Sequence, residues 1–250
     1  MFKVIKGWLK KVPLLRRIFG TVDNRPIRDE FVIGALKRIP AGSLLLDAGC
    51  GDQFYRKYCD HLIYKAQDLG QFEVDLTPAM NTYTEKYQYG KIDYLGNVWD
   101  VAADDRTFDA ILCTEVLEHI AYPIETIKEF FRLLKPGGKL ILTAPANCLR
   151  HMDPYYFYSG FSNWWYKQIL SEHGFRIDQI DQVGDYYSWM RSGVKRTMVV
   201  NPNFFEAIVL FPAFVYFSLK KKTPESAAAL CEGYHIIATK SPEKRGRKES

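Results

Sequence analysis

From this sequence we expect neither a membrane-spanning helix nor a secretory leader. One segment, Ala207 to Leu219, is strongly apolar, but it is 13 residues long and contains Pro212, whereas a transmembrane helix needs about 20 apolar residues. The basic N-terminus lacks the apolar core of about 7 to 15 residues that a secretory signal carries. We therefore expect a cytoplasmic protein that is at most peripheral to the inner face of a membrane.

Cysteines are few, and the chain has neither internal repeats nor low-complexity segments. The five cysteines are an odd number without metal-like pairing, which predicts free thiols in a reducing cytosol. The 250 residues, 47% of them hydrophobic, suit one α/β domain with an insertion. The net charge of +5 is concentrated at the two ends, so a nucleic-acid partner is not expected.

What the sequence does have is a short apolar run, Leu44 to Gln53, that ends in a carboxylate and a glycine-broken turn. Three consecutive leucines are typical of a central strand covered on both faces. Gly49 and Gly51 allow backbone angles and close approach that a β-carbon would prevent. Gln53 to Cys59 contains no helix breaker and is expected to begin a helix. The turn then lies at a strand's carboxyl end, where open α/β sheets bind ligands.

The charges of this turn indicate the kind of ligand. A dinucleotide loop needs a third glycine, where this chain has Phe54, and it places a pyrophosphate at the helix N-terminus. Asp47 and Asp52 would repel a pyrophosphate, whereas they suit a positively charged ligand. Asp68 ends the next apolar run, about 20 residues later, where such folds hold a ribose. An ordinary strand-to-helix turn and a solvated turn aspartate remain the alternatives.

The Leu-Asp-x-Gly-x-Gly pattern of the turn resembles the first motif of class I S-adenosylmethionine-dependent methyltransferases that act on small molecules. The resemblance covers about Gly42 to Val183 and the last strand. It implies S-adenosyl-L-methionine as cofactor, held by Asp47, Gly49, Gly51 and Asp68. It also implies an α/β fold, namely a Rossmann-like doubly wound, mostly parallel seven-stranded sheet with an antiparallel last strand and helices on both faces.

Two later stretches match the same family. Gly96 to Asp100 falls where relatives carry a Gly-Asp pair at the adenine. Asn97 replaces the acid there and Val98 would pack on the purine, although Asn97 also suits the start of a turn. Thr107 to His119, a buried strand ending in a turn, matches almost residue for residue. This match implies that Glu115 lines the methionine end of the cofactor and His119 lies near the acceptor, with a turn-organising histidine as the alternative.

The substrate side is expected past Pro145. His151 to Ser159 resembles a His-x-x-Pro-Tyr-x-Phe-Tyr segment of several such enzymes, and its rings suit either the walls of a site for a sugar, quinone or lipid head group or packing beneath a loop. For transfer to oxygen, His151 and His119 are the candidate bases, oriented by Asp153 or Glu118. No further histidine-and-acid cluster with metal-ligand spacing is evident, so we expect no metal.

Two segments combine basic and apolar residues. Residues 1–20 hold six basic residues, no acid and an apolar stripe with helical spacing. Residues 184–232 form an insertion before the last strand, in which Phe204 to Leu219 is followed by three lysines, Lys220 to Lys222. Both patterns are typical of helices on an anionic membrane surface. A helix packed on the domain, and for the insertion a dimer face or a lid, remain alternatives.

The expected organisation has three parts. Residues 1–41 carry basic amphipathic and cofactor-covering helices, residues 42–240 form the methyltransferase domain with its insertion, and residues 241–250 form a charged tail. The other expected helices are Asn24 to Arg38, Pro123 to Leu134 and Phe161 to His173. The other expected strands are Leu62 to Asp68, Lys91 to Tyr94, Lys139 to Ala144, Arg176 to Val183 and Gly233 to Lys240.

Together these patterns favour an enzyme that moves a methyl group from S-adenosylmethionine to an oxygen of a small-molecule, sugar or glycolipid acceptor near the cytosolic membrane surface. Enzymes of similar layout serve bacterial surface-polysaccharide biosynthesis. A quinone or prenyl-lipid methyltransferase is one alternative. A non-catalytic cofactor-binding module, which interacts through its insertion and could form a homodimer there, is the other.

Overall fold

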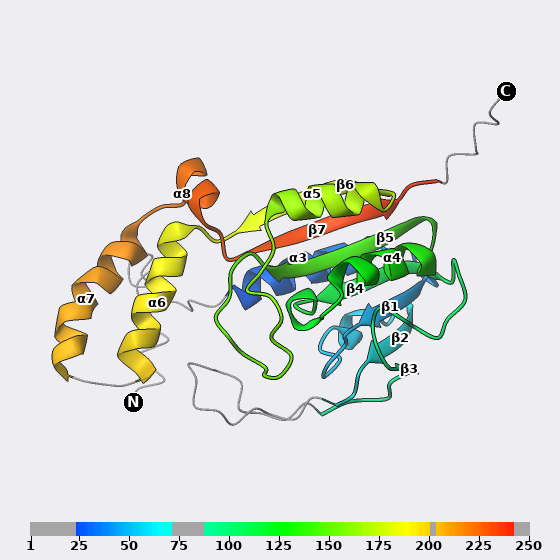
Figure 1. Ribbon diagram of the computed structural model, residues 1–250, viewed down its shortest axis with the longest axis horizontal. Helices are drawn as coiled ribbons and strands as arrows, with labels where there is room; N and C mark the ends of the chain where they lie inside the picture. The colour runs from blue at the N-terminus through cyan, green and yellow to red at the C-terminus, as the bar shows by residue number, and fades with distance from the viewer. Residues whose placement is uncertain (1–23, 72–87, 201–203, 243–250) are drawn as a thin grey trace. The chain divides into compact units, whose positions relative to one another are not determined.

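The computed structural model describes residues 24–71, 88–200 and 204–242 (Figure 1). The chain forms two compact units, one made of residues 28–181 and 234–250, the other of residues 1–27 and 182–233. The internal segment of the second unit, residues 182–233, has nearly the same bounds as the insertion predicted at 184–232. The amphipathic helix predicted for residues 1–20 and most of the predicted tail lie outside the described residues.

The larger unit is built on a seven-stranded sheet with the order β3-β2-β1-β4-β5-β7-β6. Strands β1 to β5 pair in parallel, and β7 runs antiparallel. The strands are β1 (Leu44–Ala48), β2 (Ile63–Asp68), β3 (Tyr94–Leu95), β4 (Phe108–Thr114), β5 (Leu134–Pro145), β6 (Phe175–Val183) and β7 (Gly233–Lys240). This order confirms the predicted Rossmann-like α/β fold, and it places the ends of β1, β2 and β4 at one edge of the sheet.

The two central strands owe their position to apolar residues on both faces. In β1, Leu45 and Leu46 are completely buried and point to opposite sides of the sheet. They lie beside Ala110 and Ile111 of β4, so Asp47 comes next to Leu112 at the end of the pairing. A buried central strand therefore carries Asp47 to the edge of the sheet, as the three leucines predicted.

Helices cover both faces of the sheet (Figure 1). Helix α3 (Arg25–Leu36) packs Val32 and Leu36 in one cluster with Leu45 and Leu112. The other face is covered by α4 (Pro123–Leu133) and α5 (Asn163–Glu172). The predicted bounds of α3, α4 and α5 agree with these helices to within three residues at each end.

The helix predicted at Gln53 to Cys59 is wrong. That segment contains only a short 3-10 helix, η1 (Arg56–Tyr58). Gln53 has a φ of 56°, which interrupts right-handed helical geometry, and the bond from Cys59 N to Arg56 O closes the segment after one turn. The strand predicted at Lys91 to Tyr94 is also displaced, because β3 begins at Tyr94.

The smaller unit contains three helices among its described residues. They are α6 (Tyr186–Val200), α7 (Phe204–Leu219) and α8 (Pro224–Ala229). Buried Asp185 joins two of them, because its Oδ1 caps α6 by accepting from Ser188 N at 2.9 Å and its Oδ2 accepts from Ser226 Oγ of α8 at 2.7 Å. Within the described residues, no helix is both long and apolar enough to cross a membrane.

Candidate active site

The turn after β1 contains three residues with left-handed backbone angles. The φ angles are 71° at Gly49, 51° at Gly51 and 56° at Gln53. A β-carbon on Gly49 would lie 2.6 Å from both γ-carbons of Val116, so this position needs glycine for space as well as for its backbone angle. Gln53 adopts its angle without being glycine, at a position where the resembled family commonly has one.

Gln67 carries no motif signal in the sequence, yet it holds this turn in place. It is 1% exposed, and its backbone oxygen accepts hydrogen bonds from Gly49 N at 2.9 Å and Cys50 N at 3.0 Å. Its side-chain Oε1 also accepts from Gly49 N at 3.1 Å, while its Nε2 donates to Gly96 O at 2.7 Å. Gln67 therefore links the turn after β1 to the turn after β3.

Asp68 holds the next part of the same turn. Its Oδ2 accepts from Gly51 N and its Oδ1 from Gly70 N, both at 2.9 Å. An ionised carboxylate offers about four lone-pair sites. Both oxygens of Asp68 therefore keep capacity to accept hydrogen bonds from ribose hydroxyls.

These hydrogen bonds make the turn a poor phosphate site. Phosphate-binding loops direct their backbone N–H groups at the anion. Here the N–H groups of Gly49, Cys50 and Gly51 already donate to Gln67 and Asp68. The backbone geometry thus agrees with the charge argument against a pyrophosphate ligand.

Asp47 adds a buried carboxyl at the same edge. Its side chain is 3% exposed, and its Oδ2 accepts a hydrogen bond of 2.6 Å from the Tyr64 hydroxyl. Burial raises the pKa of Asp47 to about 7; the Tyr64 hydrogen bond opposes this shift, and the negative charges of Asp68 and Asp52 add to it. A positively charged ligand would relieve this repulsion, so the residues present fit an adenosyl sulfonium.

The predicted adenine contacts follow Gly96. Val98 is 6% exposed and Asn97 is exposed. The backbone oxygen of Asn97 accepts from Asp100 N at 3.2 Å and so begins a turn. Asn97 thus begins a turn, which was the alternative expectation for this residue.

Glu115 lies at the end of β4 in a left-handed conformation with a φ of 53°. Its Oε1 accepts from Thr143 Oγ1 at 2.9 Å, and its Oε2 lies 3.4 Å from Arg28 Nη1. The sequence predicted a helix over this side of the site without naming a contact residue. Arg28 of α3 is a residue of this helix that reaches the site, because it forms an ion pair with the Glu115 carboxylate.

Glu118 and His119 follow on the 3-10 helix η2 (Leu117–His119). Burial raises the pKa of Glu118, which is 1% exposed, and the charge of Glu115 raises it further. His119 Nδ1 is 2.7 Å from Tyr155 O, and burial lowers the pKa of His119 to about 4, with a smaller contribution from His151. Tyr155 O, rather than Glu118, therefore orients the His119 ring.

The fold brings His151 to the same place. The rings of His119 and His151 meet edge to face with centroids 4.7 Å apart, and one ligand atom from each of Glu118, His119 and His151 lies within 4.8 Å of the others. Asp153 does not orient His151, because it pairs with Arg150. His151 Nδ1 is instead 2.7 Å from Leu149 O. The two predicted bases, His119 and His151, are thus neighbours, and the Glu118 carboxyl group lies beside them.

Comparison with known proteins shows similarity to methyltransferases over part of the chain. Residues 46–142 match the family model described as a methyltransferase domain. The ubiquinone biosynthesis O-methyltransferase of Xanthomonas axonopodis pv. citri is 36% identical over 123 residues, which cover 47% of this chain and 48% of that protein. Its counterpart in Xanthomonas oryzae pv. oryzae is 35% identical over the same shares of the two chains. Over residues 46–142 the chain is therefore similar to the class I S-adenosylmethionine-dependent methyltransferases. It spans about half the length of the curated relatives that it matches.

Solved structures share the fold of this chain. An S-adenosylmethionine-dependent methyltransferase from Archaeoglobus fulgidus aligns with a TM-score of 0.52 at 17% identity, covering 84% of this chain and 94% of that chain. The [4+2]-cyclase SpnF aligns with a TM-score of 0.55 at 17% identity, covering 86% and 81%. Likeness at this identity concerns the fold. The cofactor of the family is S-adenosyl-L-methionine.

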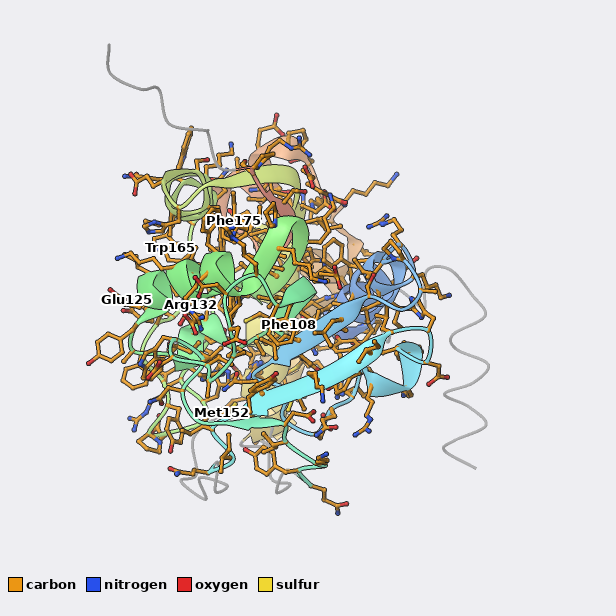
Figure 2. All side chains as sticks on the ribbon, turned by 90° about the vertical axis from the view of Figure 1, so that its right-hand side faces the viewer. Phe108, Glu125, Arg132, Met152, Trp165 and Phe175 are labelled. Atoms are coloured by element: carbon orange, nitrogen blue, oxygen red, sulfur yellow. The ribbon has the colours of Figure 1, made fainter. Side chains whose placement is uncertain are left out.

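The aromatic segment of this methyltransferase fold is anchored to the main chain around it. Tyr156 donates from its hydroxyl to Cys148 O at 3.1 Å, and Tyr158 donates to Ala121 O at 3.3 Å. Phe157 is 49% exposed. Figure 2 shows Met152 of this loop well away from Phe175, the first residue of β6. Two of the four Tyr and Phe rings in this segment are thus tied to the surrounding main chain, whereas Phe157 is exposed.

A separate surface hollow of about 420 Å³ lies near the beginnings of β3 and β4. Tyr94 and Thr107 contribute to its lining. None of the predicted cofactor-binding or catalytic residues lines this hollow.

Proposed function

We propose that the protein transfers the methyl group of S-adenosylmethionine to an oxygen atom of a small-molecule, sugar or glycolipid acceptor. The observation that carries this proposal is the acidic turn after β1. Its backbone N–H groups are already bonded to Gln67 and Asp68, and Asp47 is held close enough to Asp68 and Asp52 for their charges to interact. That arrangement favours a cation over a phosphate.

In this proposal the predicted cofactor residues act together. Asp47, Gly49 and Gly51 form the turn around the methionine and ribose, and Asp68 accepts from the ribose hydroxyls. Val98 packs against the adenine, whose edge Asn97 contacts, and Glu115 lines the methionine end. Since the sulfonium methyl is already activated, the protein gains rate chiefly by holding the acceptor oxygen in line with the carbon–sulfur bond.

The proton of an acceptor hydroxyl needs a destination. His151 and His119 each bond a carbonyl through Nδ1, which leaves Nε2 of a neutral ring as an acceptor. Burial lowers the pKa of His119 to about 4, which makes it a poor proton acceptor in the folded protein. We therefore assign the role of base to His151, with His119 as its neighbour.

The acceptor has two candidate classes. A sugar or glycolipid hydroxyl is one class, which His151 could serve as base. A quinone or other prenyl-lipid phenol is favoured by the curated relatives, whose names place them as O-methyltransferases of ubiquinone biosynthesis. Both classes require transfer to oxygen.

A membrane-bound acceptor would also explain helix α7. Phe205 is 76% exposed, Val209 73% and Ile208 56%, and Lys220 to Lys222 follow the helix directly with exposed side chains. A short apolar helix followed by lysines suits the head-group region of an anionic bilayer. The alternative, a homodimer through the same helix, would give a protein of doubled mass in solution.

Calorimetry with S-adenosylmethionine and its demethylated product tests the cofactor assignment. We expect both to bind the wild type and to bind Asp68→Ala at least tenfold more weakly, with the exposed Asp60→Ala as a matched control. Lack of binding by the wild type would contradict the proposal. A labelled methyl donor, incubated with separate polysaccharide and lipid extracts, then identifies the acceptor; label confined to quinones would favour the second class, and cofactor binding without any transfer would favour a non-catalytic module.

A further inference from the structure

Three ligand-type atoms converge beside the cofactor turn, although their residues come from two distant segments. Glu118 and His119 lie on η2, and His151 lies on the loop after β5. Their nearest ligand atoms all fall within 4.8 Å of one another, and Glu118 Oε1 is 3.7 Å from His119 Nε2. Ligands bound about 2.0–2.2 Å from one ion lie roughly 3–4 Å apart, so small side-chain adjustments would suffice.

Both histidine rings are already oriented as metal ligands usually are. A carbonyl oxygen can only accept a hydrogen bond, so the contacts of His119 Nδ1 with Tyr155 O and of His151 Nδ1 with Leu149 O, each 2.7 Å, place the hydrogen on Nδ1. In each neutral ring Nε2 then carries the lone pair. A carbonyl that holds the far nitrogen of a ligating imidazole is the common second contact of metal-bound histidine.

The Glu118 carboxylate supplies a second, independent observation. The residue is 1% exposed, and its Oε2 is buried without a hydrogen-bond partner. A buried carboxylate oxygen without a partner is costly. A cation bound beside Glu118 would remove that cost.

We infer that Glu118, His119 and His151 bind one divalent transition-metal ion of the zinc or manganese type. One carboxylate and two imidazoles form a ligand set that such ions accept, and three protein ligands leave a position open. Binding of the ion does not depend on the proposed methyl transfer. Only the ion's role rests on that function.

In that role the ion takes the place of the histidine base, because metal and proton compete for the same Nε2 lone pairs. An acceptor hydroxyl in the open position loses its proton to solvent more easily beside a divalent cation. Its oxygen then forms a bond to the methyl carbon as the carbon–sulfur bond breaks, and the sulfonium becomes a neutral thioether. The acceptors best suited to this site are alcohols and phenols.

Metal content and titration of the full chain test the inference. Protein stripped with EDTA and titrated with Zn²⁺ and with Mn²⁺ should bind one equivalent of at least one ion, and Co²⁺ should give visible absorption bands from nitrogen and oxygen ligation. His151→Ala should bind that ion at least tenfold more weakly, while His173→Ala, at the end of α5, should bind as the wild type does. Circular dichroism of each variant monitors folding.

Two results would overturn the inference: a stripped wild type that binds neither ion, or a His151→Ala variant that binds as tightly as the wild type. Glu118→Gln gives a second check, because it keeps the size of the side chain but removes its charge, and it should also weaken binding of the ion. S-adenosylmethionine binding, measured in the presence of EDTA, separates the two proposals. If cofactor binds and no metal does, the metal site fails and the proposed function stands.

Discussion

Gly49 lies so close to Val116 that a β-carbon at Gly49 would be 2.6 Å from both of the valine's γ-carbons. The first residue of the turn after β1 is thereby packed against the segment that leads from Glu115 to His119. Any side chain at Gly49 would push the cofactor turn away from the predicted catalytic segment. This contact makes the two motifs one structural site.

Gly49→Ala should weaken S-adenosylmethionine binding at least tenfold and lower the free energy of unfolding by about 2–4 kcal/mol. The cost combines a positive φ, worth about 1 kcal/mol, with overpacking worth about 1–3 kcal/mol. Gly42→Ala is the matched control, because its φ is also positive at 79° but its β-carbon would meet open space. Urea unfolding and calorimetry should show a small stability loss and unchanged affinity for Gly42→Ala; equal effects of the two variants would contradict the role of Val116.

Titration of Asp47 should destabilise the cofactor-free protein as pH rises from 5 to 8, whereas the lowered pKa values of His119 and His235 act in the opposite direction over this range. Burial raises the pKa of Asp47 in the folded state to about 7, above its ordinary value of 3.8, so the folded state holds the proton more tightly than the unfolded state does. Its contribution is complete below about pH 4 and is lost as pH rises through about 7. Between pH 5 and 8 the loss is roughly 2–3 kcal/mol.

Urea unfolding at a series of pH values measures this loss. Asp47→Asn removes the titrating group, so its stability relative to the wild type should rise by roughly 2–3 kcal/mol between pH 5 and 8, whereas Asp60→Asn, at an exposed aspartate, should leave the profile unchanged. An identical slope in Asp47→Asn and wild type would show that other groups cause the dependence.

Gln67→Leu should destabilise the protein by about 1–3 kcal/mol, because it removes the side-chain donor to the partly buried carbonyl of Gly96. We also expect several-fold weaker S-adenosylmethionine binding, since the turns after β1 and β3 lose their common link. Gln168→Leu changes an exposed glutamine of α5 in the same way chemically. Thermal unfolding and calorimetry on both variants check the prediction, and a Gln67→Leu protein with wild-type affinity would contradict the linking role.

Anionic liposomes should carry the wild type upward in a flotation gradient at low salt. The double variant Phe205→Ser and Val209→Ser, which removes two of the most exposed apolar side chains of α7, should float at least tenfold less. Trp164→Ser is the control, because Trp164 is 72% exposed on α5 of the other unit. A wild type that remains at the bottom at every salt concentration would exclude membrane binding, and doubled mass by light scattering would favour the dimer.

The sheet was predictable because its signal is local. The leucines of β1 and the apolar run of β4 report burial on both faces, and acids or glycines mark where each strand ends. The helix expected at Gln53 failed because helix propensity says nothing of a left-handed angle. That angle accompanies a folded contact, since the Gln53 side chain donates to Lys91 O at 2.9 Å.

The site was predictable only in part, since its partners are set by register and by loops. Gln67 looks like any strand residue in the sequence, yet pairing places it beneath the turn after β1. His151 was recognised from its segment, but nothing in its spacing indicated that the loop would return it to Glu118 and His119. Likewise, nothing in the sequence around Arg28 indicates that the fold pairs it with Glu115.

The sheet order also has a consequence for protein synthesis. Strand β7 lies between β5 and β6, so β6 has no neighbour to bond until residues 233–240 have left the ribosome. At roughly 5–20 residues per second, the newly made β5 waits several seconds with one edge unpaired. During that interval a nascent chain offers an open edge to other chains, and a chaperone that shields it would raise the yield of folded protein.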